Sequence, residues 1–477
     1  MTPRSVLVSL VAALAFAAAS AQDSAPTSKP TNDAETIARR IEERVAKLRG
    51  LAFKSPTKIG VYTKEELKSF LLKEAEKELA PEATEPVRRA YTLFGLMPEA
   101  FDLRASLLKV LESQIAGFYN PEKKELFLIR IAAGSGDAAR TVDESIMSHE
   151  LVHALQDQYF DLKTAMDRLK KNNDRLNAYK SLVEGDAMYA MMVFSMAGKT
   201  DDLEAAMKAV NMSAAMMPTT LKDLRPLFER AKAQMGKDGG LDLGSMDAET
   251  LLAAPAVIGD EMVFAYLGGM RFCAYALQNG AEKGMQAVDQ AFRKPPESTE
   301  QILHPEKYSK VPDGPTEVAL PDLSKVLGTG WKELASDTLG ELHVRTLLND
   351  NGVKRPGRIH AGWDGDRYAV YAKDGAADVL AWYSVWDTKK DAGEFAEAQK
   401  EIFALRLATH ETTAGESLTL YVGLNGTSSF VALVDNRVLV VKNAPSDKAR
   451  ALFDKLRSDT ALSGDVPSAT AEEETEK

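Results

Sequence analysis

Cysteine is almost missing from this chain of 477 residues, which contains one, Cys273. A single thiol cannot form a disulfide within the chain, and zinc sites built from cysteine need several thiolates. Both a disulfide-stabilised scaffold and a cysteine-ligated metal site are therefore excluded. Cys273 lies in the apolar stretch from Phe264 to Leu277, so we expect it to be buried and structural.

Other absences narrow the function further. No basic stripe runs along the chain, and 70 Asp and Glu outnumber 59 Lys and Arg, for a formal net charge of −11. We therefore expect no nucleic-acid partner. Glycine-rich phosphate loops are missing, and so is any pattern that indicates Ser, Cys or paired-carboxylate catalysis. Beyond the N-terminus, no apolar run is long enough to span a membrane.

The N-terminus has the three parts of a secretory signal peptide. Arg4 supplies a positive charge, Val6 to Ala18 form an apolar run, and Ala19-Ser20-Ala21 fits a cleavage site. A transmembrane anchor is the alternative, but the run is shorter than the ~20 residues that a span needs. We expect residues 1–21 to be removed and the protein to be exported, as a periplasmic or secreted protein.

The rest of the chain divides by pattern into four parts. We expect a disordered linker at 22–33, a mostly helical catalytic domain with a small β-sheet at 34–312, an α+β module at 322–462, and a disordered acidic tail at 463–477. The predicted fold class is therefore α+β. Residues 34–116 are predicted to be helical, and an inhibitory segment that covers the cleft is one reading of them.

Periodicity predicts several individual elements. Helices are expected from Thr141, the first residue of a capping box with Glu144, to about Tyr159, and from about Asp174 to Met196. Eight strands and two later helices are also expected. The strands are Ile59 to Tyr62, Phe118-Tyr119, Leu126 to Ile129, Tyr368 to Tyr371, Val379 to Val385, Leu418 to Val422, Phe430 to Val434 and Val438 to Val441; the later helices are Asp391 to Leu407 and Ser446 to Leu456.

One short motif carries chemistry: His149-Glu150-Leu151-Val152-His153. Residues four apart lie on one face of a helix, so His149 and His153 can offer ring nitrogens to one metal ion. Glu150 is placed to act as general base toward a water at that metal. The alternative is a helix with two ordinary polar histidines. With only six His in the chain, the motif favours a catalytic zinc ion.

A catalytic zinc ion typically has three protein ligands. The pattern with a third His six residues on fails, because that position is Tyr159. Glu184, on the next predicted helix and among apolar residues, is the best candidate for the third ligand; a solvated surface charge is the alternative. Asp157 and Asp186 are candidates to orient a ligand imidazole. Gly185 would permit close helix packing.

The segment from His149 to Asp157, followed by Glu184, resembles the gluzincin branch of zinc peptidases, which have thermolysin-like active sites. The resemblance implies that His149, His153 and Glu184 are ligands and that Glu150 is the general base. Four stretches are similar to a poorly characterised group of exported prokaryotic zincin-like proteins. They are Gly117 to Pro121, the zinc helix, Glu184 to Ala187, and Ser298 to Pro305.

A peptidase of this kind also needs a donor for the oxyanion. We expect His304, in a proline-rich loop, to supply it, with Tyr308, Tyr119 and Tyr189 as alternatives. The sequence therefore predicts an exported zinc metallopeptidase that acts on polypeptides. Two other readings stay open, an inactive zincin-fold binding protein and a zinc hydrolase of a non-peptide amide such as a cell-wall bond.

Overall fold

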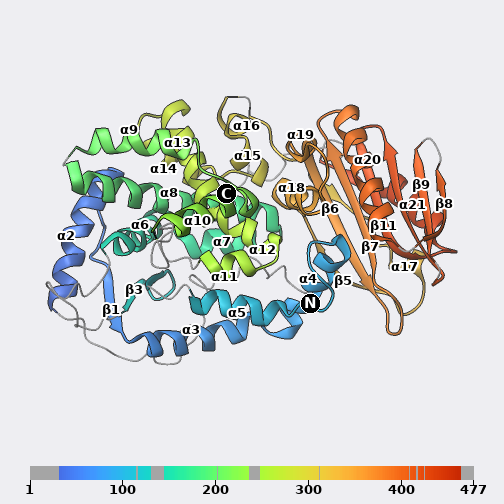
Figure 1. Ribbon diagram of the computed structural model, residues 1–477, viewed down its shortest axis with the longest axis horizontal. Helices are drawn as coiled ribbons and strands as arrows, with labels where there is room; N and C mark the ends of the chain where they lie inside the picture. The colour runs from blue at the N-terminus through green and yellow to red at the C-terminus, as the bar shows by residue number, and fades with distance from the viewer. Residues whose placement is uncertain are drawn as a thin grey trace, which may run out of the picture.

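The computed structural model describes residues 32–113, 117–129, 144–200, 202–235, 248–310, 312–407, 409–414, 417–423 and 425–463. Its fold is α+β, as the sequence predicts: a helical body lies at one end of the long axis and a seven-stranded sheet at the other (Figure 1). The expected signal peptide and Thr141 lie outside the described residues. The linker boundary is wrong by two residues, because α2 begins at Asn32.

The helical body contains many helices and only three strands in its described part. No helix among the described residues is long and apolar enough to cross a membrane. Its elements are α2 (Asn32–Arg49), β1 (Lys58–Tyr62), α3 (Lys64–Glu78), α4 (Pro81–Phe94), α5 (Leu103–Ser113), β2 (Gly117–Asn120), β3 (Glu125–Ile129), α6 (Glu144–Phe160), α7 (Leu162–Leu169), α8 (Asn173–Thr200), α9 (Leu203–Ala214), α10 (Leu221–Met235), α11 (Ala248–Ala253), α12 (Ala256–Val263), the π-helix η1 (Phe264–Gly268), α13 (Gly269–Asn279), α14 (Gln286–Arg293), α15 (Thr299–Leu303) and α16 (Pro305–Ser309).

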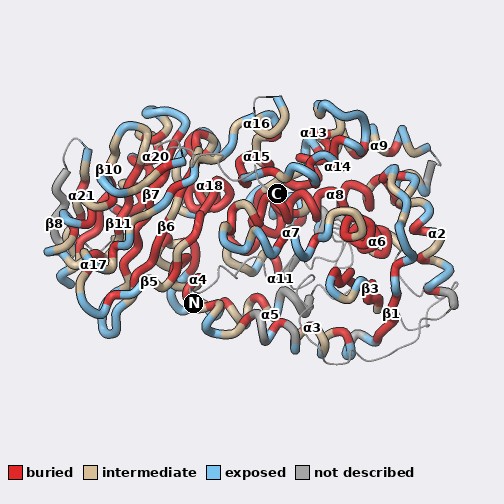
Figure 2. The backbone as a smooth tube through the Cα atoms, turned by 180° about the vertical axis from the view of Figure 1, so that it is seen from behind, coloured by how far each residue is buried: buried red, intermediate tan, exposed pale blue. Residues whose placement is uncertain are grey.

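Helix α8 is the centre of this body. It is buried on all sides along most of its length (Figure 2), and it packs against α6, α9, η1 and α13. A helix that is buried around its whole circumference belongs to the core, and most of its surface must be apolar. Tyr179, Leu182, Val183 and Ala187 supply that apolar surface and are at most 1% exposed. Polar residues on α8 are therefore held inside the protein, away from bulk water.

Two glycines, Gly185 of α8 and Gly269 of α13, determine how closely these two helices approach each other. A Cβ atom on Gly185 would lie 2.0 Å from the backbone carbon of Gly269, and one on Gly269 would lie 1.8 Å from the carbonyl oxygen of Ser181. Real side chains never come so close, so only glycine fits at either position. The crossing brings η1, which directly precedes Gly269, beside the part of α8 that contains Glu184.

The small sheet has the order β1-β3-β2, so β2 is an edge strand. Strand β1 pairs with β3 in parallel, and β2 pairs with β3 antiparallel, with Phe118 opposite Phe127. The Asn120-Pro121 turn expected from the sequence joins β2 to β3. Helix α6 packs against β2, so the edge strand lies next to the helix with the zinc motif.

The second part of the chain forms an antiparallel sheet of order β5-β6-β7-β11-β10-β9-β8. All of the strands predicted there are present, while β4, β5, β8, β12 and helix α18 were not predicted. The elements are β4 (Val318–Ala319), α17 (Ser324–Leu327), β5 (Lys332–Asp337), α18 (Gly340–Asp350), α19 (Pro356–His360), β6 (Trp363–Ala372), β7 (Val379–Trp386), α20 (Lys389–Arg406), β8 (Thr409–Ala414), β9 (Leu418–Gly423), β10 (Thr427–Val434), β11 (Arg437–Pro445), α21 (Ala449–Asp459) and β12 (Ala461–Leu462).

The two faces of this sheet contribute to different cores. Successive side chains of a strand point to opposite faces. In β7, Leu380 and Trp382 join the core that extends into the helical body, whereas Ala381 and Tyr383 join a smaller core under α17 and α21. The helical body and the sheet therefore share one continuous core.

Replacing Gly269 with alanine tests the helix crossing. We expect Gly269→Ala to lower the free energy of unfolding by about 3 kcal/mol in urea denaturation, because its new Cβ must displace backbone atoms. The matched control is Gly393→Ala within α20, where a Cβ meets no atom within 4 Å. This control should gain about 0.5–1 kcal/mol. Equal effects of the two substitutions would contradict the proposed close approach.

Candidate metal centre

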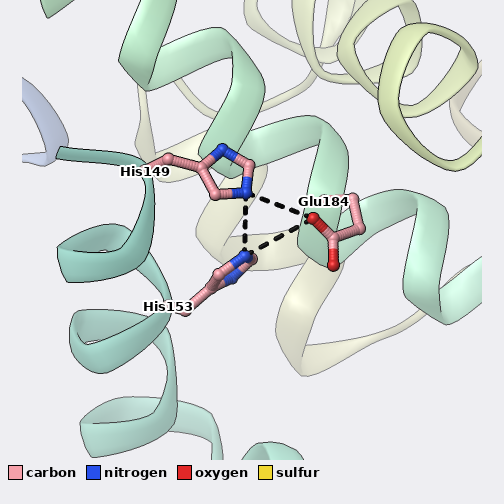
Figure 3. Close-up of side chains that lie close together, drawn as sticks. All are labelled: His149, His153 and Glu184. Atoms are coloured by element: carbon pink, nitrogen blue, oxygen red, sulfur yellow. Dashed lines mark hydrogen bonds and ion pairs between the residues drawn. The ribbon is translucent and has the colours of Figure 1, made fainter. Parts of the chain in front are cut away.

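Helix α6 presents the two histidines of the motif side by side. Leu151, Val152 and Leu155 are buried and anchor the helix in the core. His149 and His153, one turn apart, are 7% and 4% exposed and point toward Glu184 of α8 (Figure 3). The two imidazole rings meet edge to face, with their centroids 4.7 Å apart.

Glu184 of α8 completes a group of three facing side chains, as predicted. Its Oε2 lies 3.3 Å from His149 Nε2 and 3.4 Å from His153 Nε2, and the two Nε2 atoms are 3.1 Å apart (Figure 3). Glu184 is 2% exposed. The structure therefore brings together residues from two helices that are 35 positions apart in the sequence.

These three distances fit a shared metal ion. Zinc bonds to imidazole nitrogen and carboxylate oxygen of about 2.0–2.1 Å place the ligand atoms of a tetrahedron about 3.3–3.4 Å apart. The observed triangle, with sides of 3.1, 3.3 and 3.4 Å, is close to one face of that tetrahedron. Two nitrogens and one carboxylate oxygen are also a common ligand set of catalytic zinc.

The charge distribution favours an ionised third ligand. Burial works to raise the pKa of Glu184, but the His153 and His149 imidazoles outweigh it and hold that pKa well below its usual range. The Glu184 carboxylate is therefore an anion at neutral pH, which is the form that binds a cation.

Glu150 lies beside the triangle without belonging to it. Its Oε2 accepts a hydrogen bond of 2.8 Å from the backbone N–H of Tyr119 in β2. Burial raises the pKa of Glu150, although the two histidines and the Tyr119 N–H act in the opposite direction. A raised pKa makes this carboxylate a better proton acceptor than an exposed one.

Gln156 fixes the orientation of His153, a role that we did not predict. His153 Nδ1 lies 2.9 Å from Gln156 Oε1, so Nδ1–H donates and Nε2 is the ring nitrogen that faces His149 and Glu184. The Gln156 amide donates in turn to the carbonyl oxygen of Val183, at 3.0 Å, and to Asp186 Oδ2, at 2.8 Å. Asp186 therefore helps to orient the His153 ring indirectly, through its hydrogen bond with Gln156.

Arg49 of α2 anchors this chain of contacts. It is 1% exposed and forms ion pairs with Asp186, at 3.1 Å, and with Asp289 of α14, at 2.8 Å. The side chain of Asp157, the other predicted orienting residue, is engaged by β2 and the turn that follows it. It accepts hydrogen bonds from the Tyr119 hydroxyl, at 2.8 Å, and from Lys124.

Tyr266 is the second residue at the centre that the sequence did not reveal. Its ring lies over His149, with centroids 6.0 Å apart and planes 20° apart. Its hydroxyl donates to Glu184, and burial together with the Glu184 and Glu150 charges raises its pKa well above the ordinary value. Tyr266 belongs to η1, and π-helical turns are frequent at functional sites.

The structure does not place His304 at this centre, which corrects the prediction for it. His304 Nε2 lies 2.9 Å from Glu341 Oε1 of α18, and His360 Nδ1 lies 2.6 Å from the same oxygen. His304, Glu341 and His360 form a second group that could hold a metal ion. The two nitrogen–oxygen distances in this group, 2.9 and 2.6 Å, are those of hydrogen bonds. The group lies where α15 packs against α18.

Two of the three tyrosines named as alternatives are engaged elsewhere. The Tyr308 hydroxyl donates to the carbonyl oxygen of Lys294, and that of Tyr119 donates to Asp157. The Tyr189 hydroxyl is buried without a partner among the described residues.

A third group of possible metal ligands consists of Glu300, Asp313 and Asp387. These carboxylates surround the ammonium of Lys307 instead.

The buried ion pairs of Arg49 predict a large stability effect. Arg49→Met should lower the free energy of unfolding by about 3–5 kcal/mol, because Asp186 and Asp289 would stay buried without a counter-ion. The matched control is Arg40→Met on the same helix, whose exposed ion pair with Glu144 should contribute at most about 1 kcal/mol. Urea denaturation measures both, and a similar small loss in the two variants would contradict the anchoring role of Arg49.

A match to a known protein family is found only in the second part of the chain. A family model described as a domain of unknown function (DUF8575) matches residues 326–452. No curated protein and no solved structure matches the chain. The matched region contains all seven strands of the larger sheet, together with Glu341 and His360, while His149, Glu150, His153 and Glu184 all lie before it.

Proposed function

We propose that this protein is an exported zinc metallopeptidase of the gluzincin type. The observation that carries the proposal is the triangle of His149 Nε2, His153 Nε2 and Glu184 Oε2, with sides of 3.1–3.4 Å, next to a buried carboxylate that is not one of the three. A site that only holds structure has no use for that fourth group. Glu150 is the feature that favours catalysis.

His149, His153 and Glu184 would hold the zinc ion. When bound, zinc supplies Lewis acidity, which polarises an amide carbonyl and makes water acidic near neutral pH. Gln156 keeps the His153 ring in the tautomer that leaves Nε2 free. Three protein ligands leave room for water and substrate, as catalytic rather than structural sites do.

Glu150 would act as the general base. Its carboxylate accepts the proton of the attacking water and then delivers a proton to the amine that leaves. Burial raises its pKa, and the Tyr119 N–H holds the carboxylate in place. The hydrogen bond from β2 therefore positions Glu150 without using a ligand atom.

The edge strand β2 supplies a place for an extended polypeptide substrate. The N–H and C=O of one residue in a strand point to the same side. The Tyr119 N–H points to Glu150 rather than to β3, so the Tyr119 C=O is directed to the same outer edge. A peptide that pairs with this edge lies beside the metal centre, a common mode of peptide recognition.

Tyr266 would turn its hydroxyl from Glu184 and donate a hydrogen bond to the oxyanion. The hydroxyl lies at Glu184, and its raised pKa keeps it protonated at neutral pH. A neutral donor next to the developing negative charge stabilises the transition state more than the ground state. This role replaces the one expected of His304.

Glu150→Gln tests the catalytic proposal. We expect the variant to bind one zinc ion per chain, measured by mass spectrometry of the metal, and to cleave casein or a peptide library about 10²–10⁴-fold more slowly than wild type. Glu144→Gln, in the first turn of the same helix and half-exposed, should leave both measurements unchanged.

Unchanged cleavage by Glu150→Gln would contradict the proposed mechanism. Zinc binding by the wild type with no hydrolysis would favour the binding-protein alternative. Hydrolysis of cell-wall amides without hydrolysis of peptides would favour the second alternative.

Tyr266→Phe tests the oxyanion donor. We expect kcat to fall about 10²-fold, with KM and zinc content little changed, because the lost hydrogen bond strengthens only in the transition state. Steady-state kinetics on a peptide substrate measures the two constants. A rise in KM at constant kcat would show that Tyr266 only helps to bind substrate.

A further inference from the structure

One face of α8 is polar although it is buried. Its polar residues are spaced three and four apart, so they form a stripe that ends at the metal ligand. Each of them is at most 6% exposed. The members of this α8 stripe are Asp174, Asn177, Lys180, Ser181 and Glu184.

Two donors of the α8 stripe have no partner in the described structure. Lys180 is 3% exposed, and its Nζ has neither a hydrogen bond nor an ion pair there. The side-chain nitrogen of Asn177 is equally buried and unpaired. By contrast, Ser181 donates to the Asn177 carbonyl oxygen at 2.8 Å, and Asp174 accepts from Thr299.

A buried ammonium without a partner is costly. Burial lowers the pKa of Lys180 to about 7, even though Glu261 and Glu184 act to raise it. Buried charges in proteins are normally paired or hydrogen-bonded. An anion that arrives only with a ligand would satisfy this lysine.

Glu261, the acid that acts most strongly on Lys180, does not neutralise it. Glu261 of α12 uses Oε1 for a short hydrogen bond with His343 of α18, and the Tyr91 hydroxyl lies 3.5 Å from the same oxygen. A carboxylate and an imidazole that share one proton are neutral as a pair, wherever that proton lies. Lys180 therefore has no hydrogen-bonded carboxylate among the described residues, and the Glu184 charge, which belongs to the metal ligand, acts on it only through space.

We propose that Lys180 and Asn177 form a subsite that binds a carboxylate of the peptide substrate. This inference rests on the peptidase function proposed above and names its substrate class. Lys180 lies four residues before Glu184, about 6 Å along the helix axis. One residue of extended peptide spans about 3.3–3.6 Å. A carboxylate bound there would therefore lie within a few residues of the bond that is cleaved.

Such a carboxylate has two sources, the C-terminus of a peptide or an acidic side chain. Three libraries of N-acetylated tetrapeptides separate them. The first lacks Asp and Glu and has a free C-terminal carboxylate, the second is the same library amidated, and the third is amidated but contains Asp and Glu. Cleavage is followed by mass spectrometry with zinc-loaded wild type and Lys180→Met.

We expect wild type to cleave one of the two carboxylate-bearing libraries at least about 10-fold faster than the second library, since a hydrogen bond to a charged group contributes about 1.5–3 kcal/mol. Lys180→Met should abolish this preference while keeping its zinc. It should also have a higher melting temperature than wild type, because it removes an unpaired buried charge. The library that is preferred identifies the source.

The control is Lys442→Met in β11. Lys442 is another partly buried lysine whose pKa burial lowers, and it contacts the backbone of Leu93, away from the α8 stripe. It should keep the wild-type preference. A wild type without a preference, or a Lys180→Met variant that retains one, would overturn the subsite and leave the peptidase proposal intact.

A binding measurement separates failure of the subsite from failure of the peptidase proposal. If wild type cleaves no library, calorimetry with the first and second libraries on zinc-loaded wild type and Lys180→Met decides the question. Tighter binding of the free acids that Lys180→Met loses supports the subsite. Equal affinity for acids and amides overturns it.

Discussion

The packing of α6 against α8 is the constraint on which the rest of the structure depends. It places two imidazoles and a carboxylate within 3.4 Å of one another in a buried region. Three polar groups in a core are stable together only if each has a partner. The surrounding residues meet this requirement: Gln156 holds His153, and Arg49 balances the acid behind Gln156.

The same crossing of helices determines which residues can take part in chemistry. Gly185 lets the segment before Gly269 approach α8, and that segment contains the π-helical turn with Tyr266. The edge strand β2 also packs against α6 and holds Glu150. Helix, π-turn and strand therefore meet around one point, although they come from separate parts of the chain.

The two buried cations Arg49 and Lys180 of the helical body differ in their partners. Arg49 has two carboxylate partners and belongs to the framework. Lys180 has none in the described structure, and it lies on the same helix face as a metal ligand. This difference is the reason for assigning the first residue to stability and the second to substrate binding.

Much of this arrangement follows from the sequence, because it depends on local periodicity. Spacing of four residues puts His149 and His153 on one helix face, and alternation predicts strands such as β7. Contacts between distant segments were not accessible in this way. Tyr266 depends on a π-turn that no pattern reveals, and Gln156 matters only because Asp186 comes close. His304 was misplaced, since nothing local indicates that α15 packs against α18.

The central claim is that a metal ion sits between α6 and α8. Anomalous diffraction at the zinc absorption edge, from crystals of the zinc-loaded protein, tests it most directly. The account predicts one strong peak about 2.0–2.2 Å from His149 Nε2, His153 Nε2 and Glu184 Oε2. A strong peak only between His304, Glu341 and His360, or no peak at either group, would contradict it.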